Sequence, residues 1–311
     1  MKRFILAVAA LFMAATMISA QDMAEATELY NNGATALTTK NYTEALDCFQ
    51  KALEMGQAIG ADADELVANC KNAIPGISLQ IAKELIKDSK YDEAASQLEA
   101  AAKVAAEFEN EEVAAEAVEL VPQMWTKKGN DALKIKDYAE AAAGFEKAYA
   151  ADTTDGKTAV KLGQVYSTMG KVQEAQDIFQ HAIWNGEEEA ANNQLATLFV
   201  KEANSAFKGN KLAAAVTAAE KAMTFAENPT AYLIAGQASQ KLNKNNDAIK
   251  YFEKYLELKP DASNAGAIAF TVGALYQGAK NNAKALEFYK KVENDAKFGA
   301  QAKQMISALS K

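Results

Sequence analysis

The sequence is poor in the residues that break helices and in those that build catalytic centres. Its 311 residues include four prolines, 16 glycines, two cysteines and one histidine. One histidine cannot supply a histidine-based zinc site, and the chain contains neither an H-E-x-x-H motif nor a C-x-x-C pair. A catalytic triad is not indicated either, because His181 has no serine or cysteine partner in register. We therefore expect no catalytic residue, no metal and no cofactor.

Strand-like runs, in which Val, Ile or Thr alternate with polar residues, are also missing, whereas alanine is abundant. The sequence therefore predicts an all-α fold. The formal net charge is -8 and the chain shows no cluster of basic residues. Such an acidic chain argues against nucleic acid or an anionic membrane surface as a partner.

The first twenty residues are typical of a secretory signal peptide. Lys2 and Arg3 precede an apolar run from residue 4 to 17, and Ile18-Ser19-Ala20 ends it with small residues before Gln21. The run is too short for a spanning helix. We expect residues 1–20 to be removed, leaving an exported protein of the periplasm or cell envelope, or a secreted one, with no membrane span. An uncleaved anchor is the alternative.

The stretch from residue 157 to 186 predicts two short helices folded back on each other. Leu162 and Tyr166 fall on one face of the first helix, and Phe179 and Ala182 fall on one face of the second. A Gly-Lys pair separates the two patterns. One such hairpin cannot bury both of its apolar faces, so it needs neighbours.

The same spacing recurs seven times along the chain. Each repeat can be aligned on an alanine of its second helix: Ala45, Ala94, Ala141, Ala175, Ala215, Ala248 and Ala285. Twelve residues before it stands a small residue: Gly33, Ala82, Gly129, Gly163, Ala203, Gly236 or Gly273. Four residues after it an aromatic or apolar residue recurs: Phe49, Leu98, Phe145, Phe179, Ala219, Phe252 and Tyr289.

This pattern resembles the tetratricopeptide repeat, a helix-turn-helix unit of about 34 residues. The resemblance covers residues 21–311 and implies a right-handed superhelical α-solenoid of about seven repeats with a C-terminal capping helix. The implied units lie near residues 23–60, 62–108, 110–152, 156–188, 190–228, 229–261 and 264–297, and the cap at 298–311. Two intervals are longer, and each carries a proline, Pro75 or Pro122, sixteen residues before a turn tyrosine. We read both as elongated first helices, kinked or restarted at the proline.

Polar residues recur on the first helices, one residue after the small one. They are the amides Asn130, Gln164, Asn204 and Gln237, followed on the same helical face by Lys134, Lys208 and Lys241. In proteins of this family that face lines a concave groove for extended peptides. Amides can donate to and accept from a peptide backbone, and the lysines favour an acidic or carboxylate-ending ligand. The alternative is a polar face that only solvates the groove.

The sequence therefore favours a non-catalytic scaffold that binds an extended protein segment in its groove in the cell envelope. A structural spacer or assembly subunit of an envelope complex is the second hypothesis. A hydrolase would need convergent carboxylates in a pocket, which the spacing does not show.

The two cysteines add one further hypothesis. Cys48 and Cys70 lie about eleven residues on either side of a turn near Gly60, so a disulfide could join them across the hairpin, and two buried thiols are the alternative.

Overall fold

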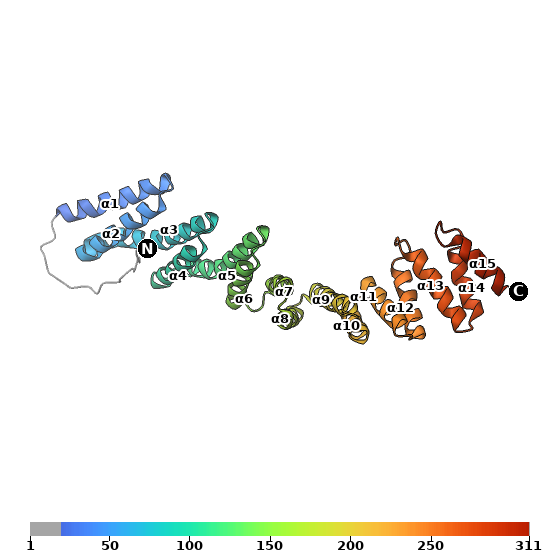
Figure 1. Ribbon diagram of the computed structural model, residues 1–311. Coiled ribbons are helices and arrows are strands. Elements are labelled where there is room, and N and C mark those ends of the chain that lie inside the picture. The colour runs from blue at the N-terminus through green and yellow to red at the C-terminus, as the bar shows by residue number, and fades with distance from the viewer. Residues whose placement is uncertain (1–19, 311) are drawn as a thin grey trace. The chain divides into compact units, whose positions relative to one another are not determined.

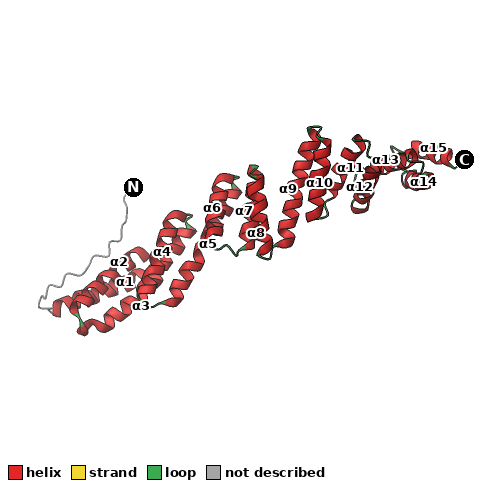
Figure 2. Ribbon diagram, turned by 90° about the horizontal axis from the view of Figure 1, so that it is seen from below, coloured by secondary structure: helices red, strands yellow, loops and turns green. Residues whose placement is uncertain are grey.

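The computed structural model describes residues 20–310, which form fifteen α-helices, one short 3-10 turn and no strand. The all-α solenoid expected from the repeat pattern is confirmed for these residues, as Figures 1 and 2 show. The expected signal segment, residues 1–20, lies outside the described residues apart from Ala20, with which the first helix begins. None of the described helices is long and apolar enough to cross a membrane.

The chain divides into two compact units, the first ending at Asp131 and the second beginning at Ala132. The first unit contains α1 (Ala20–Thr38), α2 (Tyr42–Ile59), the 3-10 turn η1 (Ala61–Ala63), α3 (Asp64–Lys87), α4 (Tyr91–Glu107) and most of α5 (Glu111–Lys134). Helices α1 and α2 pack as one hairpin, α3 and α4 as the next, and α2 packs on α3.

The second unit continues the same alternation after the end of α5. Its helices are α6 (Tyr138–Ala151), α7 (Gly156–Met169), α8 (Val172–Trp184), α9 (Glu188–Lys208), α10 (Leu212–Phe225), α11 (Pro229–Lys241), α12 (Asn245–Leu258), α13 (Ala265–Gly278), α14 (Asn282–Lys291) and α15 (Gly299–Leu309). Helices α7 to α14 pair as four successive hairpins, and α15 packs on α14. The buried Ala302 and the half-buried Ile306 of α15 join the apolar cluster of α12, α13 and α14, which is the capping role expected of this helix.

Close approach of two helices in a hairpin depends on the small residue of the repeat. A Cβ built on Gly163 would lie 2.5 Å from the Phe179 ring, and one on Gly236 would lie 2.6 Å from the Phe252 ring. These aromatic rings are almost completely buried. The spacing read from the sequence therefore identifies the true packing contacts of the fold.

The prolines lie inside two long helices of equal length. Helices α3 and α5 each have 24 residues, and Pro75 and Pro122 are each the twelfth residue of their helix. The expected elongated first helices are thus present, and each runs through its proline as one element. Proline lacks an amide hydrogen, so each helix loses one backbone hydrogen bond at this point.

Each hairpin turns through one residue with a positive φ. These residues are Lys40, Ser89, Lys136, Gly170, Asn210, Asn243 and Lys280, with φ between 56° and 78°. Glycine adopts this left-handed conformation without strain, but only one of the seven positions has it. The turns therefore share one backbone geometry despite different residues.

Candidate functional site

The first helices of three hairpins in the second unit, α7, α9 and α11, lie side by side. Two side-chain contacts join them. Lys201 of α9 donates from Nζ to Ser167 Oγ of α7 at 3.4 Å, and Lys241 Nζ of α11 lies 4.6 Å from the ring centroid of Phe207 in α9. We call the solvent-facing side of these three helices, which carries Gln164, Asn204, Gln237, Lys208 and Lys241, the first-helix face.

The packing of the small residues fixes which side chains reach this face. Because Gly163 and Gly236 face the second helix of their hairpins, the next residue of each helix is turned about 100° away. Gln164 is exposed and Gln237 is half-buried. Asn204, which follows the fully buried Ala203, is exposed as well. The structure thus places three of the four expected amides on adjacent helices, two of them exposed and one half-buried.

The lysines expected beside these amides are exposed at the ends of their helices. Lys208 and Lys241 are the last residues of α9 and α11, one turn beyond Asn204 and Gln237. A lysine in the last turn of a helix complements the helix dipole. The face therefore combines neutral amides with a positive charge at the end of α9 and of α11, whereas α7 has no basic residue in its last turn.

Asn130 and Lys134 stand apart from this group. Both belong to α5, but Asn130 falls in the first compact unit and Lys134 in the second. Asn130 is half-buried and Lys134 is exposed. The part of the expected site that can be described as one surface is the set on α7, α9 and α11.

A cavity of about 700 Å³, not expected from the sequence, lies between α12, α13 and α14. Leu256, Ala269 and Phe288 line its apolar side. Five carboxylates and one lysine also line it: Glu253, Glu257, Asp261, Glu287, Asp295 and Lys291. Most of these carboxylates already have partners, since Glu253 accepts from Tyr276, Glu257 pairs with Lys254, Glu287 pairs with Lys284 and Lys291, and Asp295 accepts from two backbone amides before α15. Of these contacts the Glu253–Tyr276 bond joins two hairpins, whereas the ion pairs lie within single helices.

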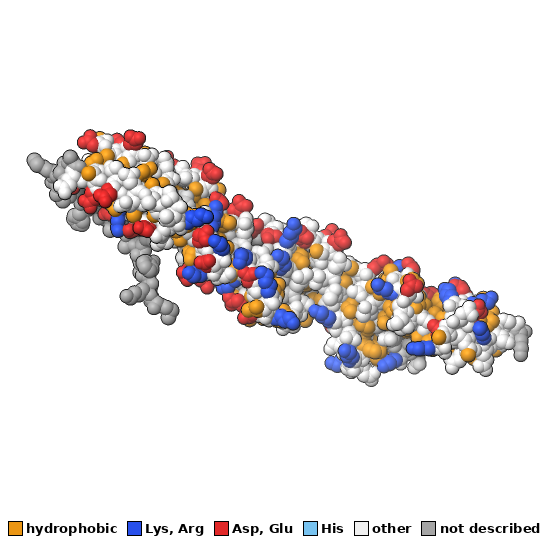
Figure 3. Space-filling view, turned by 90° about the horizontal axis from the view of Figure 1, so that it is seen from above, with side chains coloured by type: hydrophobic (Ala, Val, Ile, Leu, Met, Phe, Trp, Pro, Cys, Tyr) orange, Lys and Arg blue, Asp and Glu red, His pale blue; other side chains and the backbone are white. Residues whose placement is uncertain are grey.

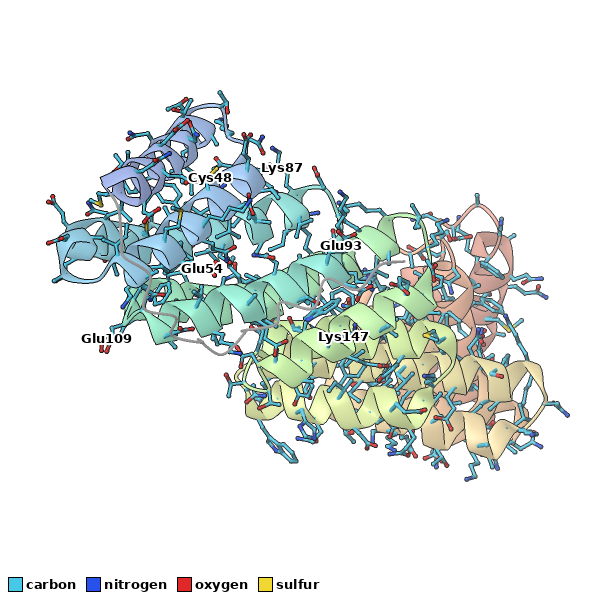
Figure 4. The ribbon with its side chains drawn as sticks, turned by 90° about the vertical axis from the view of Figure 1, so that its left-hand side faces the viewer. Cys48, Glu54, Lys87, Glu93, Glu109 and Lys147 are labelled. Atoms are coloured by element: carbon cyan, nitrogen blue, oxygen red, sulfur yellow. The ribbon has the colours of Figure 1, made fainter. Side chains whose placement is uncertain are left out.

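A smaller slot of about 280 Å³ lies in the first unit between α2, α3 and α4. Leu53, Ile74 and Phe108 give it an apolar lining, and Gln97 donates across it to the hydroxyl and carbonyl oxygens of Ser78. Glu54, labelled in Figure 4, lines the slot from α2.

Three tyrosines of the second unit donate hydrogen bonds to glutamates of a neighbouring hairpin. Tyr166 donates to Glu146 and Tyr276 to Glu253, both at 2.8 Å, and Tyr251 donates to Glu220. Burial raises the pKa of Tyr166 and of Tyr276 to about 12, and the glutamate partners add to the rise. The pKa of Tyr251 is raised for the same reasons. These bonds hold adjacent hairpins in register.

The hypothesis of a disulfide between Cys48 and Cys70 is wrong for this structure, which holds both as free thiols. A Cβ on Gly56 of α2 would meet Val67 and Leu66 of α3, so these positions face each other. Counting back along α2 and forward along α3, Cys48 (Figure 4) lies level with Ile74, four residues from Cys70. Four residues correspond to about 6 Å along the axis, so the two sulfurs are not opposite.

Burial raises the pKa of both thiols. Cys70 is fully buried, and burial raises the pKa of its thiol to about 11. Cys48 is half-buried, and burial together with the nearby Asp47 carboxylate raises the pKa of its thiol as well. Of the two buried thiols that the sequence offered as the alternative, Cys70 packs as a small apolar residue, whereas Cys48 is only half-buried.

The described residues contain no group of three or more His, Cys, Asp or Glu side chains that could hold a metal ion. His181, the only histidine of the chain, is exposed on α8, where its Nδ1 lies 2.9 Å from the hydroxyl of Tyr149.

Comparison with known proteins agrees with this architecture. A tetratricopeptide repeat family model matches residues 157–183 and 229–262, which correspond to the α7/α8 and α11/α12 hairpins. These two hairpins are therefore tetratricopeptide repeats, and the other hairpins of the described residues repeat the same helix-turn-helix architecture.

Several solved structures resemble it. A crystal structure of MamA is 19% identical over 58% of this chain and 94% of its own, with a TM-score of 0.37. YrrB, described as a tetratricopeptide repeat protein with an unusual peptide-binding site, is 21% identical over 58% of this chain and 91% of its own, with a TM-score of 0.34. The TPR2AB domain of yeast Sti1, in complex with pHSP90, is 17% identical over 93% of this chain and 100% of its own, with a TM-score of 0.33.

Proposed function

We propose that this protein is a non-catalytic scaffold that binds an extended protein segment on the first-helix face, and that it does so in the cell envelope after export. The observation that carries the proposal is a row of three amides on adjacent packed helices, of which Gln164 and Asn204 are exposed and Gln237 is half-buried. Each primary amide has two donors and a carbonyl acceptor. Such a row can hydrogen-bond a peptide backbone without requiring a particular sequence.

The lysines refine the kind of segment. Lys208 and Lys241 stand one helical turn from Asn204 and Gln237, at the same end of their helices. Charges arranged in this way favour an acidic or carboxylate-ending segment and set the direction in which it runs. Lys241 is additionally held over the Phe207 ring, which limits its freedom before a ligand arrives.

The test is a double substitution on the first-helix face, Gln164→Ala with Asn204→Ala. Cross-linking of the tagged protein in intact cells, followed by purification, should recover a partner with the parent chain and lose it with this variant. The matched control is Gln180→Ala with Gln301→Ala, which removes two exposed amides from α8 and α15. Retention of the partner by the first variant and loss by the control would favour a structural spacer that works through its other surfaces.

Export is tested separately. Fractionation by osmotic shock, with mass spectrometry of the intact purified chain, should find the protein in the periplasmic or extracellular fraction with Gln21 as its first residue. Recovery of the full-length chain in the membrane fraction would support the uncleaved anchor.

A further inference from the structure

Charge is separated between the two kinds of connection in the second unit. The turns within its hairpins (135–137, 170–171, 209–211, 242–244 and 279–281) contain five lysines and one aspartate. The connections between hairpins (152–155, 185–187, 226–228, 259–264 and 292–298) contain seven carboxylates and two lysines. In stacked antiparallel hairpins the two kinds of connection lie at opposite ends of the helices. One edge of the stack is therefore basic and the other acidic.

The basic edge is most regular on three consecutive hairpins, α7/α8, α9/α10 and α11/α12. Its lysines are Lys171, Lys208, Lys211, Lys241 and Lys244, all of them exposed. Among the described residues, no ion pair within 4.0 Å involves any of these five. The nearest acidic positions on the same helices are Glu174 and Asp247, in the first turns of α8 and α12. We call these five lysines the lysine edge.

Local helix chemistry does not explain three of these lysines. Lys171, Lys211 and Lys244 occupy the N-cap positions of α8, α10 and α12, and none makes a side-chain capping hydrogen bond. Lysine is a poor cap because it cannot accept a hydrogen bond, and its charge opposes the positive end of the helix dipole.

At the equivalent position α4 of the first unit also carries a lysine without a side-chain capping bond, Lys90, whereas three other hairpins use better caps. Asn41, Asp137 and Asn281 each accept a hydrogen bond there from the backbone amide three residues later. Three consecutive hairpins thus carry a lysine at the N-cap of their second helix, although Asn or Asp at this position would stabilise the helix better. Breaks of a local rule of this kind are expected at functional positions.

We propose that the lysine edge binds the acidic residues of the same extended protein segment whose backbone lies on the first-helix face; this inference rests on the proposed function. Lys208 and Lys241 belong to both surfaces, so a segment lying across the amides passes directly beside the edge. Figure 3 shows lysines in blue bordering apolar side chains in orange on one face of the C-terminal half.

The distance between equivalent turns along the lysine edge indicates which sequence pattern such a segment would have. Helices α7, α9 and α11 are packed neighbours, so equivalent turns lie on the order of 10 Å apart. An extended chain in the polyproline II conformation advances about 3.1 Å per residue and returns to the same face every three residues, so roughly three residues span one hairpin. The edge therefore matches a segment with an acidic residue at every third position.

The experiment uses a fluorescent peptide of five Glu-Ser-Ala triplets, with the same peptide carrying Gln for Glu as the reference. Fluorescence anisotropy at low salt should show that the parent protein binds the Glu peptide at least tenfold more tightly than the Gln peptide. The variant Lys171→Asn/Lys211→Asn/Lys244→Asn should lose that preference. Its melting temperature should rise or stay unchanged, because asparagine restores the caps.

The matched control removes three exposed lysines elsewhere in the same unit: Lys157→Gln/Lys250→Gln/Lys303→Gln. It has the same net charge as the edge variant and should keep the preference for the Glu peptide. Equal losses in the two variants would overturn the inference, because only net charge would then matter. So would binding of the parent protein to phosphatidylglycerol vesicles without any preference for the Glu peptide.

The two proposals can fail separately. If Gln164→Ala/Asn204→Ala abolishes partner capture while the edge variant keeps both the partner and the Glu preference, binding on the first-helix face is supported and the lysine edge is refuted. If the edge variant loses the Glu peptide while the amide variant still captures its partner, the edge stands and the amide face is refuted.

Discussion

The ammonium group of Lys241 lies 4.6 Å from the centroid of the Phe207 ring, and this contact joins two first helices of neighbouring hairpins. Lys241 ends α11 and Phe207 is the second-last residue of α9. A lysine over an aromatic face at an exposed site contributes about 0.5–1 kcal/mol. The contact therefore positions a charge of the candidate site while it fixes the spacing of the helices that carry the amides.

The contact between Gly163 and Phe179 should make the glycine position intolerant of any side chain. Gly163→Ala places a Cβ 2.5 Å from a fully buried ring, so we expect a loss of about 1–3 kcal/mol in the free energy of unfolding. Urea denaturation followed by circular dichroism measures it. Gly278→Ala, where nothing lies within 4 Å, is the control and should cost nothing. Equal stability of both variants would contradict the packing of this hairpin.

Truncation of Phe179 should be more damaging than truncation of a larger residue on the same helix. Phe179 is 0% exposed, and Phe179→Ala should destabilise the protein by about 3–5 kcal/mol through lost burial and the cavity left behind. Trp184 is 70% exposed, so Trp184→Ala should change stability by no more than about 0.5 kcal/mol. Thermal melts of the two variants would disprove the assignment if the tryptophan variant were the less stable one.

Alkaline pH should weaken the contacts between hairpins. Burial raises the pKa of Tyr166 and Tyr276 from 10.0 to about 12, so the folded state favours the neutral phenol. Their contribution is complete below pH 10 and is lost as the pH rises toward 12. The urea midpoint should therefore fall between pH 9 and pH 11.5, and fall less in Tyr166→Phe/Tyr276→Phe. An identical fall in parent and variant would show that other groups cause the effect.

The two thiols should differ in reactivity. Cys70 is fully buried with a thiol pKa of about 11, whereas Cys48 is half-buried. Because the thiolate is the reactive form, Cys48 should react with a disulfide reagent at neutral pH well before Cys70 does. Mass spectrometry of the protein alkylated without reductant after unfolding should find two modified cysteines. A mass lower by two hydrogens, with no alkylation, would show that the predicted bond forms after all.

Much of the fold could be read from the sequence because each hairpin repeats one local rule. The small residue, the alanine and the aromatic ring stand at fixed intervals, and Gly163 and Phe179 meet as that spacing predicts. The position of each proline in its long helix was equally readable, since Pro75 and Pro122 precede a turn tyrosine by the same distance.

Contacts between elements were harder to predict. Whether Cys48 lies opposite Cys70 depends on where the turn after α2 begins and ends. The 3-10 turn at Ala61–Ala63 displaces the two cysteines by about one helical turn along the helix axes. The stacking of Lys241 on Phe207 depends on how two hairpins pack, which spacing within one hairpin does not set. The charged residues are visible in the sequence, but their separation into a basic and an acidic edge becomes visible only once the positions of the turns are known.

The two prolines have a mechanical consequence. Without an amide hydrogen at Pro75 and Pro122, the carbonyl groups of Lys71 and Val118 lack their usual helical partners. Bending strains a helix least where no hydrogen bond has to stretch. A force that deforms the long helices should therefore bend them at these two prolines. Each helix should then behave as two stiff segments connected by a flexible point near its middle.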